Sequence, residues 1–349
     1  MQSAKFHSRA VLRNVVAALI GAFALSVASA GEALDPAEAQ ARATWRANIE
    51  QIETPAQGCF HASYPNLGWE NVACRSGQPR AYFVPRKLTA GKLDVVGDGH
   101  DYAAGVTGLI SRTVGSFPIV LGVKTEESVG VAAFGDGGIL GPNEYSLQLN
   151  SNFAAGSAAC NGIPGCLVWQ QFVYSPDYLA PGVAGVFIEY WLIFEYGQPA
   201  DYTCPPGWYD IPPYYCVINS AYTAAPDFPA TDLASMRLSG YAVADGNDTI
   251  VVSHDREAYS LSVPDNVVDL ATVWSQSEFN VIGNAGGSEA VFNPYTMIWV
   301  SVAVSSGSFA APSCVRNAGT TGETNNLNLG GCSALPGPVP WILFPESNF

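Results

Sequence analysis

Three segments of this 349-residue chain place acids, amides and aromatic rings where they could do chemistry. The first surrounds Glu278. In an extended strand side chains alternate between two faces, so Phe279 and Val281 would enter a core. The even positions would then line the opposite face with an indole, a carboxyl group and two amides, from Trp274, Glu278, Gln276 and Asn280. Such a face fits a cleft floor, although a solvent-exposed strand face has the same pattern.

The second segment, Leu167–Tyr174, carries two adjacent amides, Gln170 and Gln171, inside apolar sequence. Adjacent strand residues point to opposite faces, so at least one of the two amides is buried unless it faces a cleft. A buried amide must be hydrogen-bonded, so a structural glutamine is the default interpretation. An amide that faces a cleft would instead be available to a ligand.

The third segment, Val186–Phe194, holds a single acid, Glu189, between Phe187 and Trp191 on one strand face. Burial among aromatic rings disfavours the charged form of a carboxyl group and raises its pKa. A raised pKa is what a general acid requires, and pairing with a hydrogen-bond donor is the structural alternative. We therefore expect Glu189 and Trp191 to contact substrate beside the amides.

Short runs in these segments resemble the eqolisins, the secreted glutamic peptidases. "VWQQFV" resembles the strand that bears the family's glutamine, "QSEFNVIG" the strand that bears its glutamate, and "FIEYWLI" the aromatic strand between them. The resemblance implies a β-sandwich that is made with a signal and a pro-segment and is active in acid. It also implies that Glu278 is a general base towards water and that Gln170 stabilises the oxyanion, a role that Gln171 could equally fill. Phe279 stands where the family has tryptophan.

Eight segments rich in β-branched and aromatic residues are expected to position these side chains. They are 145–150, 167–174, 186–194, 236–243, 249–253, 258–263, 277–282 and 296–304. Many short strands without intervening helices predict an all-β fold, an antiparallel β-sandwich or jelly roll of the concanavalin-like kind. The chain also resembles uncharacterised secreted bacterial proteins through "YSLQLN", "WQQFVYS", "YWLI", "GNDT" and "GETNNLNL", and this resemblance implies no activity.

The sequence divides into 1–30, 31–92 and 93–349. Residues 1–30 join a basic start, an apolar run and Ala28-Ser29-Ala30, which is typical of a cleaved secretory signal, so we expect a secreted protein without a membrane anchor. Seven basic and six acidic residues lie in 31–92, against five and twenty-four in 93–349. We expect 31–92 to form a helix that starts at Asp35-Pro36, then a disulfide loop. It is either a pro-segment held to the acidic body by charge or the first part of the domain.

All eight cysteines follow residue 30, and an even number in an exported protein predicts disulfides. Among about 105 pairings, joining sequence neighbours is the simplest. This predicts the bonds Cys59–Cys74, Cys160–Cys166, Cys204–Cys216 and Cys314–Cys332. A metal site built from these cysteines is not expected, because no pair has CxxC spacing.

Charge excludes one class of partner: a net charge of −15 argues against nucleic acids, which need clustered positive charge. We expect no cofactor: the acid-rich loops at 97–101 and 245–248 could bind calcium through oxygens, but turns have the same composition and are the favoured interpretation. Three functions remain. They are an acid-active peptidase using Glu278 with Gln170, a carbohydrate-active jelly roll using Glu189 and Glu278 as a carboxylate pair, and a non-catalytic module that binds glycan or protein. The expected partner is an extracellular polypeptide or glycan.

Overall fold

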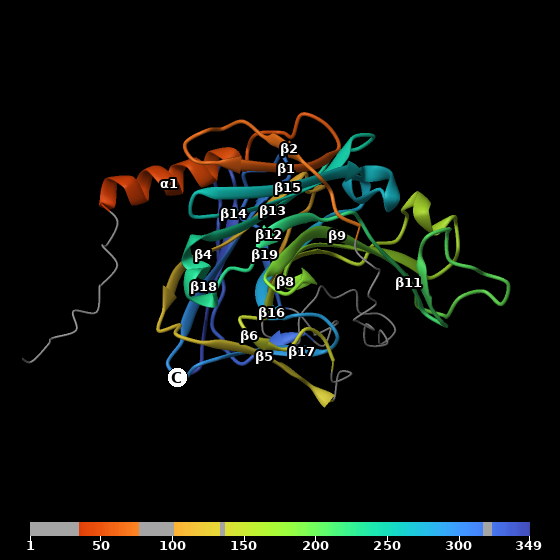
Figure 1. The fold of residues 1–349 in the computed structure, drawn as a ribbon. Coiled ribbons are helices and arrows are strands. Elements are labelled where there is room, and N and C mark those ends of the chain that lie inside the picture. The colour runs from red at the N-terminus through yellow and green to blue at the C-terminus, as the bar shows by residue number, and fades with distance from the viewer. Residues whose placement is uncertain (1–34, 77–100, 133–136, 317–322) are drawn as a thin grey trace, which may run out of the picture.

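The structure is a computed structural model, and it describes residues 35–76, 101–132, 137–316 and 323–349. Two large antiparallel sheets pack against each other, and a smaller sheet lies beside them (Figure 1). This confirms the predicted β-sandwich. The expected signal, 1–30, lies outside the described residues. Among the residues that are described, no helix is long and apolar enough to cross a membrane.

The first sheet contains most strands of the N-terminal and C-terminal thirds of the chain. Its order is β2 (Glu70–Val72), β1 (Gly58–Ser63), β15 (Glu257–Pro264), β14 (Asn247–His254), β13 (Met236–Ala242), β4 (Arg112–Leu121), β18 (Met297–Ser305), β23 (Trp341–Ser347) and β21 (Asn328–Leu329), with β22 (Ser333–Leu335) also paired to β23.

The second sheet contains all three segments that the sequence singled out. Its order is β10 (Tyr209–Ile211), β11 (Tyr215–Asn219), β9 (Val183–Phe194), β8 (Cys166–Ala180), β7 (Tyr145–Ser151), β16 (Gln276–Gly283), β3 (Tyr102–Gly105) and β19 (Ser313–Arg316), with β12 (Thr223–Pro226) also paired to β9.

A four-stranded sheet and short helical turns complete the described fold. The strands are β20 (Thr324–Asn325), β17 (Ser288–Phe292), β5 (Glu126–Gly130) and β6 (Gly141–Pro142), and the helices are α1 (Pro36–Ile49), η2 (Ala158–Cys160), η3 (Ala230–Ser235), η4 (Asp265–Val267) and η5 (Leu270–Thr272).

The core between the two large sheets fixes which side chains of the second sheet point outward. Phe172 of β8 lies so close to Gly240 of the first sheet that a Cβ atom there would be 2.7 Å from the ring. Phe279 of β16 contacts Gly115 of the first sheet in the same way. Because strand residues alternate, the neighbours Gln171 and Glu278 lie on the other face, which we call the outer face of the second sheet.

β1 pairs with the edge of β15 that β14 leaves open, and α1 packs against both strands (Figure 1). The side chain of Asp35 caps α1 by accepting from the amide of Ala37, and Trp45 and Ile49 are buried against Ala62 and Ala258. The predicted helix is therefore confirmed. The described part of 31–92 extends the first sheet by two strands, and its removal from the secreted protein stays a prediction.

All four predicted disulfides are confirmed: Cys59–Cys74, Cys160–Cys166, Cys204–Cys216 and Cys314–Cys332. Each closes a loop of 18 residues or fewer in sequence separation. Disulfides persist in oxidising compartments, so they agree with export from the cytosol.

Candidate functional site

A row of polar side chains crosses four neighbouring strands on the outer face. Strand register pairs Glu278 of β16 with Asn150 of β7, Asn150 with Gln171 of β8, and Gln171 with Glu189 of β9. Register partners project on the same side of an antiparallel sheet. The row therefore brings the carboxyl groups of two predicted site residues to either side of an amide pair.

Gln170 is not part of this row, which corrects the expectation that it shares a cleft with Glu278. Its side chain lies on the opposite face of β8, between the sheets. There its Nε2 donates to Oδ2 of Asp248 at 2.9 Å, and both residues are fully buried. The amide that shares a face with Glu278 is Gln171, the alternative that the sequence left open.

The Gln171 side chain belongs to a directed chain of hydrogen bonds. The indole Nε1 of Trp191 donates to Oε1 of Gln171 at 3.0 Å and to Oε1 of Glu189 at 2.9 Å. Gln171 Nε2 then donates to Oε1 of Gln148 at 2.8 Å, and Gln148 Nε2 donates to Oε2 of Glu323 at 2.9 Å. A carboxyl group thus lies at each end of a chain made by an indole and two amides.

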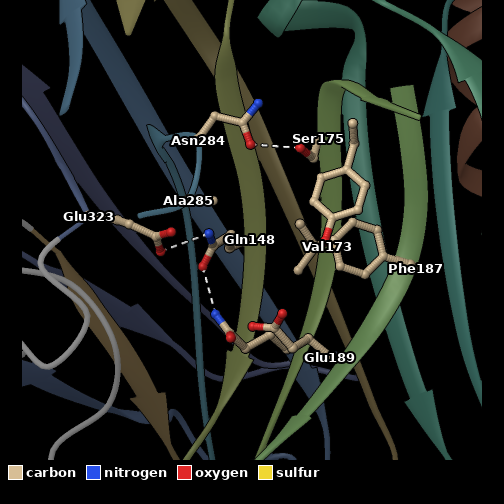
Figure 2. Close-up of a pocket in the computed structure, with 10 residues that line it drawn as sticks. Gln148, Val173, Ser175, Phe187, Glu189, Asn284, Ala285 and Glu323 are labelled. Carbon is tan, nitrogen blue, oxygen red and sulfur yellow. Dashed lines mark hydrogen bonds between the residues drawn. The ribbon is translucent and has the colours of Figure 1, made fainter. Parts of the chain in front are cut away.

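These groups border a small pocket of about 30 Å³. Figure 2 shows Gln148, Glu189 and Glu323 around it, with Ser175 donating to Oδ1 of Asn284 at 2.6 Å on another wall. A cavity needs roughly 10–15 Å³ to hold a water molecule, so this pocket can hold one. Polar side chains of the outer face therefore surround a space that suits a water or a small polar group.

Burial raises the pKa of both pocket carboxyl groups. The pKa of Glu189 rises to about 7 because desolvation outweighs the hydrogen bonds from Trp191 and Asn219. The pKa of Glu323 rises to about 8, again through desolvation, with a contribution from the charge of Glu189. Both side chains are therefore neutral in acid, where they serve as hydrogen-bonding partners and not as bases.

Glu278 has a different environment at the other end of the row. It is fully buried, and it accepts a bond from Nδ2 of Asn150 at 3.3 Å. Desolvation, followed by the charge of the neighbouring Asp101 carboxyl and a hydrogen bond to it, raises the pKa of Glu278 well above its usual value. Two adjacent carboxyl groups cannot both ionise easily, so the protonated form of Glu278 is favoured beside Asp101.

Other predicted contact residues lie away from the pocket. Trp274 precedes β16 and is buried in the core between the sheets, against Phe172. The alternation of β16 therefore does not extend to it. The prediction that Trp274 lines the outer face is wrong. Gln276 lines a separate groove beside β3 and β19. Asn280 donates to Oε1 of Glu346 at 2.8 Å and is itself buried.

The structure offers no oxygen cage at the one candidate calcium loop that it describes. In loop 245–248, Asp248 turns inward to Gln170. Among the described residues, three metal-ligating side chains come within 4.8 Å of one another only at Cys204, Asp210 and Cys216, whose cysteines are bonded to each other. The other loop, 97–101, lies outside the described residues except for Asp101.

Sequence reasoning missed Gln148, Asn150 and Glu323. The first two stand at alternate positions of the predicted strand 145–150, and the same parity argument that was applied to β16 would have placed them on the outer face. Glu323 gave no such signal, because it follows no predicted strand and reaches the site from the C-terminal segment.

Comparisons with known proteins yield structural likeness alone. Neither a family model nor a curated protein sequence matches the chain. Among solved structures, the fold is similar to scytalido-glutamic peptidase with a peptide-based transition-state analogue, at 11% identity and a TM-score of 0.31. It is also similar to SCP-B, a member of the eqolisin family of peptidases, in complex with the tripeptide Ala-Ile-His, at 10% identity and a TM-score of 0.32. Each alignment covers 74% of this chain and 99% of the other.

Proposed function

We propose that this chain is an acid-active peptide hydrolase in which the Glu278–Asp101 carboxyl pair activates water and the Gln171 amide stabilises the oxyanion. The observation that carries the proposal is the row on the outer face, where register places Glu278, Asn150 and Gln171 side by side. The short resemblance of "QSEFNVIG" and "VWQQFV" to glutamic peptidase strands supports the same two elements. The amide is Gln171 because Gln170 faces the opposite side.

The general base must be ionised at the acidic pH at which the enzyme is proposed to work. Glu189 and Glu323, whose pKa values are about 7 and 8, are neutral in acid and cannot accept a proton from water there. A carboxyl pair that shares one proton retains one ionised oxygen at a pH at which isolated buried carboxyl groups are neutral. The raised pKa of Glu278 is caused by desolvation and then by the charge of Asp101, so in the proposed pair Glu278 carries the proton and the Asp101 carboxylate accepts a proton from water.

The amide must present a donor to the developing oxyanion. An amide nitrogen has two N–H groups, and Gln171 uses one of them for Gln148. Gln171 also lines the pocket, and we assign its second N–H to the oxyanion. Two strand spacings of about 4.8 Å separate Glu278 from Gln171, so a peptide lying across the row would contact both and Asn150 between them.

The carbohydrate-active alternative fits the row poorly. Glu189 and Glu278 are three strand spacings apart, which is about 14 Å between their Cα atoms. Glycoside hydrolysis by a carboxyl pair needs a separation of about 5–10 Å. The two acids face the same side, but Asn150 and Gln171 lie between them in the row, and of the two only Glu189 lines the pocket.

Glu278 and Asn150 are fully buried, so a peptide reaches them only after the covering residues move. Removal of the predicted pro-segment, 31–92, is a separate part of the proposal, because its described strand β1 pairs with β15 of the first sheet. N-terminal sequencing of the secreted protein before and after incubation in acid tests it. A start near Gly31 that persists in a fully active protein would exclude the removal.

The function is tested by digestion of casein and of a polysaccharide panel from acidic to neutral pH. We expect proteolysis in acid by the wild type, none by Glu278→Gln, and retained proteolysis by Glu126→Gln, which alters another buried carboxyl with a raised pKa. Proteolysis that survives Glu278→Gln would remove Glu278 from the mechanism. No hydrolysis by a folded, processed wild type would favour a binding module.

A further inference from the structure

The Gln171 amide has a fixed direction. Its oxygen accepts from Trp191 and its nitrogen donates to Gln148. An indole nitrogen can only donate, so Trp191 can face only the oxygen end of the amide. The nitrogen end must then point towards Gln148, whose own oxygen receives it.

The other end of this chain of hydrogen bonds is fixed as well. Gln148 can accept from Gln171 only if its nitrogen points away, and this nitrogen donates to Glu323 at 2.9 Å and to Ser146 at 3.2 Å. Glu323 is 3% exposed, so it cannot be replaced by bulk water without rearrangement. Trp191 and Glu323 therefore anchor the two ends of one directed chain.

We propose that Trp191 and Glu323 are positioning residues that hold the Gln171 amide with its second N–H towards the pocket. The inference rests on the proposed function, since the second N–H is the donor assigned to the oxyanion. Reversal of the amide would present its oxygen to a developing negative charge, and the two would repel. Both residues thus act on the reaction through Gln171 without touching the reacting atoms.

The chain contains a matched control for Trp191. Trp169 is its register partner on β8, lies in the same apolar cluster, and is equally buried. Unlike that of Trp191, the indole nitrogen of Trp169 has no hydrogen-bond partner. Trp169→Phe therefore removes the same atoms and the same type of N–H group, beside the Trp191 ring, without removing a hydrogen bond of Gln171.

The first measurement is steady-state kinetics on a quenched peptide that the wild type cleaves in acid. Because one oxyanion donor contributes roughly 10²–10³ in kcat, we expect Trp191→Phe to lower kcat by at least about tenfold while KM stays within about twofold. Trp169→Phe should leave kcat within about twofold and lower the melting temperature by a similar amount. Equal kcat for the two variants in an enzyme that depends on Glu278 would overturn the inference.

A second measurement does not depend on activity. In protein labelled with ¹⁵N-glutamine, the side-chain signals of Gln171 are identified by their loss in Gln171→Leu. Trp191→Phe should shift these signals and Trp169→Phe should not. Unchanged Gln171 signals in Trp191→Phe would overturn the inference whatever the activity, whereas an inactive wild type with the expected shifts would overturn only the proposed function.

Glu323 provides a second pair of variants if Trp191→Phe does not fold. Glu323→Gln retains an oxygen that accepts from Gln148, and Glu323→Leu does not. We expect Glu323→Gln to keep kcat within about threefold and Glu323→Leu to lose at least about tenfold. Equal kcat values for the two variants would show that Glu323 does not position the amide.

Discussion

The N-terminal unit, which is α1 with β1 and β2, and the outer face of the second sheet both contact carboxyl groups, but the partners of these groups differ. At the N-terminal unit, the fully buried Glu50 accepts from Arg237 at 2.8 Å, and Asp255 accepts from Arg42 at 3.0 Å. On the outer face the described partners are amides, an indole and other carboxyl groups. At the N-terminal unit arginine side chains neutralise the carboxylates, whereas on the outer face the pocket carboxyl groups are neutral because they are protonated.

This difference follows from where the sequence places its cations. Residues 93–349 contain five Lys/Arg against twenty-four Asp/Glu, so most buried acids of the body have no cation to pair with. A buried charge without a partner is costly, and the group takes up a proton instead. The outer face is therefore suited to acid, whereas the N-terminal unit depends on charged contacts.

The largest expected effect is on the pH dependence of stability. Glu323 and Glu126 have pKa values raised from 4.5 to about 8, both mainly by burial. A group whose folded pKa is raised contributes stability below its unfolded pKa, near 4.5, and loses it as the pH rises towards 8. At about 1.4 kcal/mol per pKa unit, the fully buried Glu323 alone contributes up to about 5 kcal/mol.

Urea unfolding between pH 4 and pH 9 measures this effect. We expect stability to fall as the pH rises from about 5 to about 8, and Glu323→Gln to flatten that fall, because its side chain does not titrate. A chain that is more stable at pH 8 than at pH 5 would break the contrast between the two regions.

The next effect concerns the two faces of β8. Gln171→Leu should lower kcat by about 10²–10³, because it removes the assigned oxyanion donor. Gln170→Leu changes the adjacent residue on the inter-sheet face and should cost stability, through Asp248, with kcat nearly unchanged. Kinetics on a peptide substrate, with melting temperatures for both variants, measure this, and equal losses of kcat would refute the placement of the site on the outer face.

A smaller effect tests the N-terminal unit. Arg237→Ala leaves Glu50 buried without its cation and should cost about 3 kcal/mol of unfolding free energy. Arg42→Ala should cost less, because the carboxyl groups of Glu38 and Asp255 that it contacts are 36% and 40% exposed. Urea unfolding of both variants at one pH measures the two losses of unfolding free energy. A larger loss for Arg42→Ala would mean that exposed ion pairs, and not the buried Glu50, hold the N-terminal unit in place.

Much of the fold follows from local sequence. The helix has its Asp35-Pro36 start, and all four disulfides join sequence neighbours. Seven of the eight expected strands appear within three residues of their predicted bounds, and β8 continues six residues past its predicted end, to Ala180. Runs of β-branched and aromatic residues that end at turn residues depend little on distant contacts.

The site was less predictable, for two physical reasons. Gln170 and Gln171 lie in a strand that is buried on both faces, so the sequence has no hydrophobic alternation to tell the faces apart. Which of the two glutamines faces outward follows from the packing of Phe172 against Gly240 in the other sheet. Glu323 meets Gln148 across 175 residues of sequence, and no local pattern predicts such a contact.

The central claim is that Glu278 and Gln171 act as one unit, and a double-variant kinetic cycle tests it most directly. The values of kcat/KM in acid are compared for wild type, Glu278→Gln, Gln171→Leu and the double variant. Groups that serve one transition state are not additive, so the double variant should be about as slow as Glu278→Gln alone. Losses that simply multiply, or a wild-type rate that Glu278→Gln retains, would contradict the account.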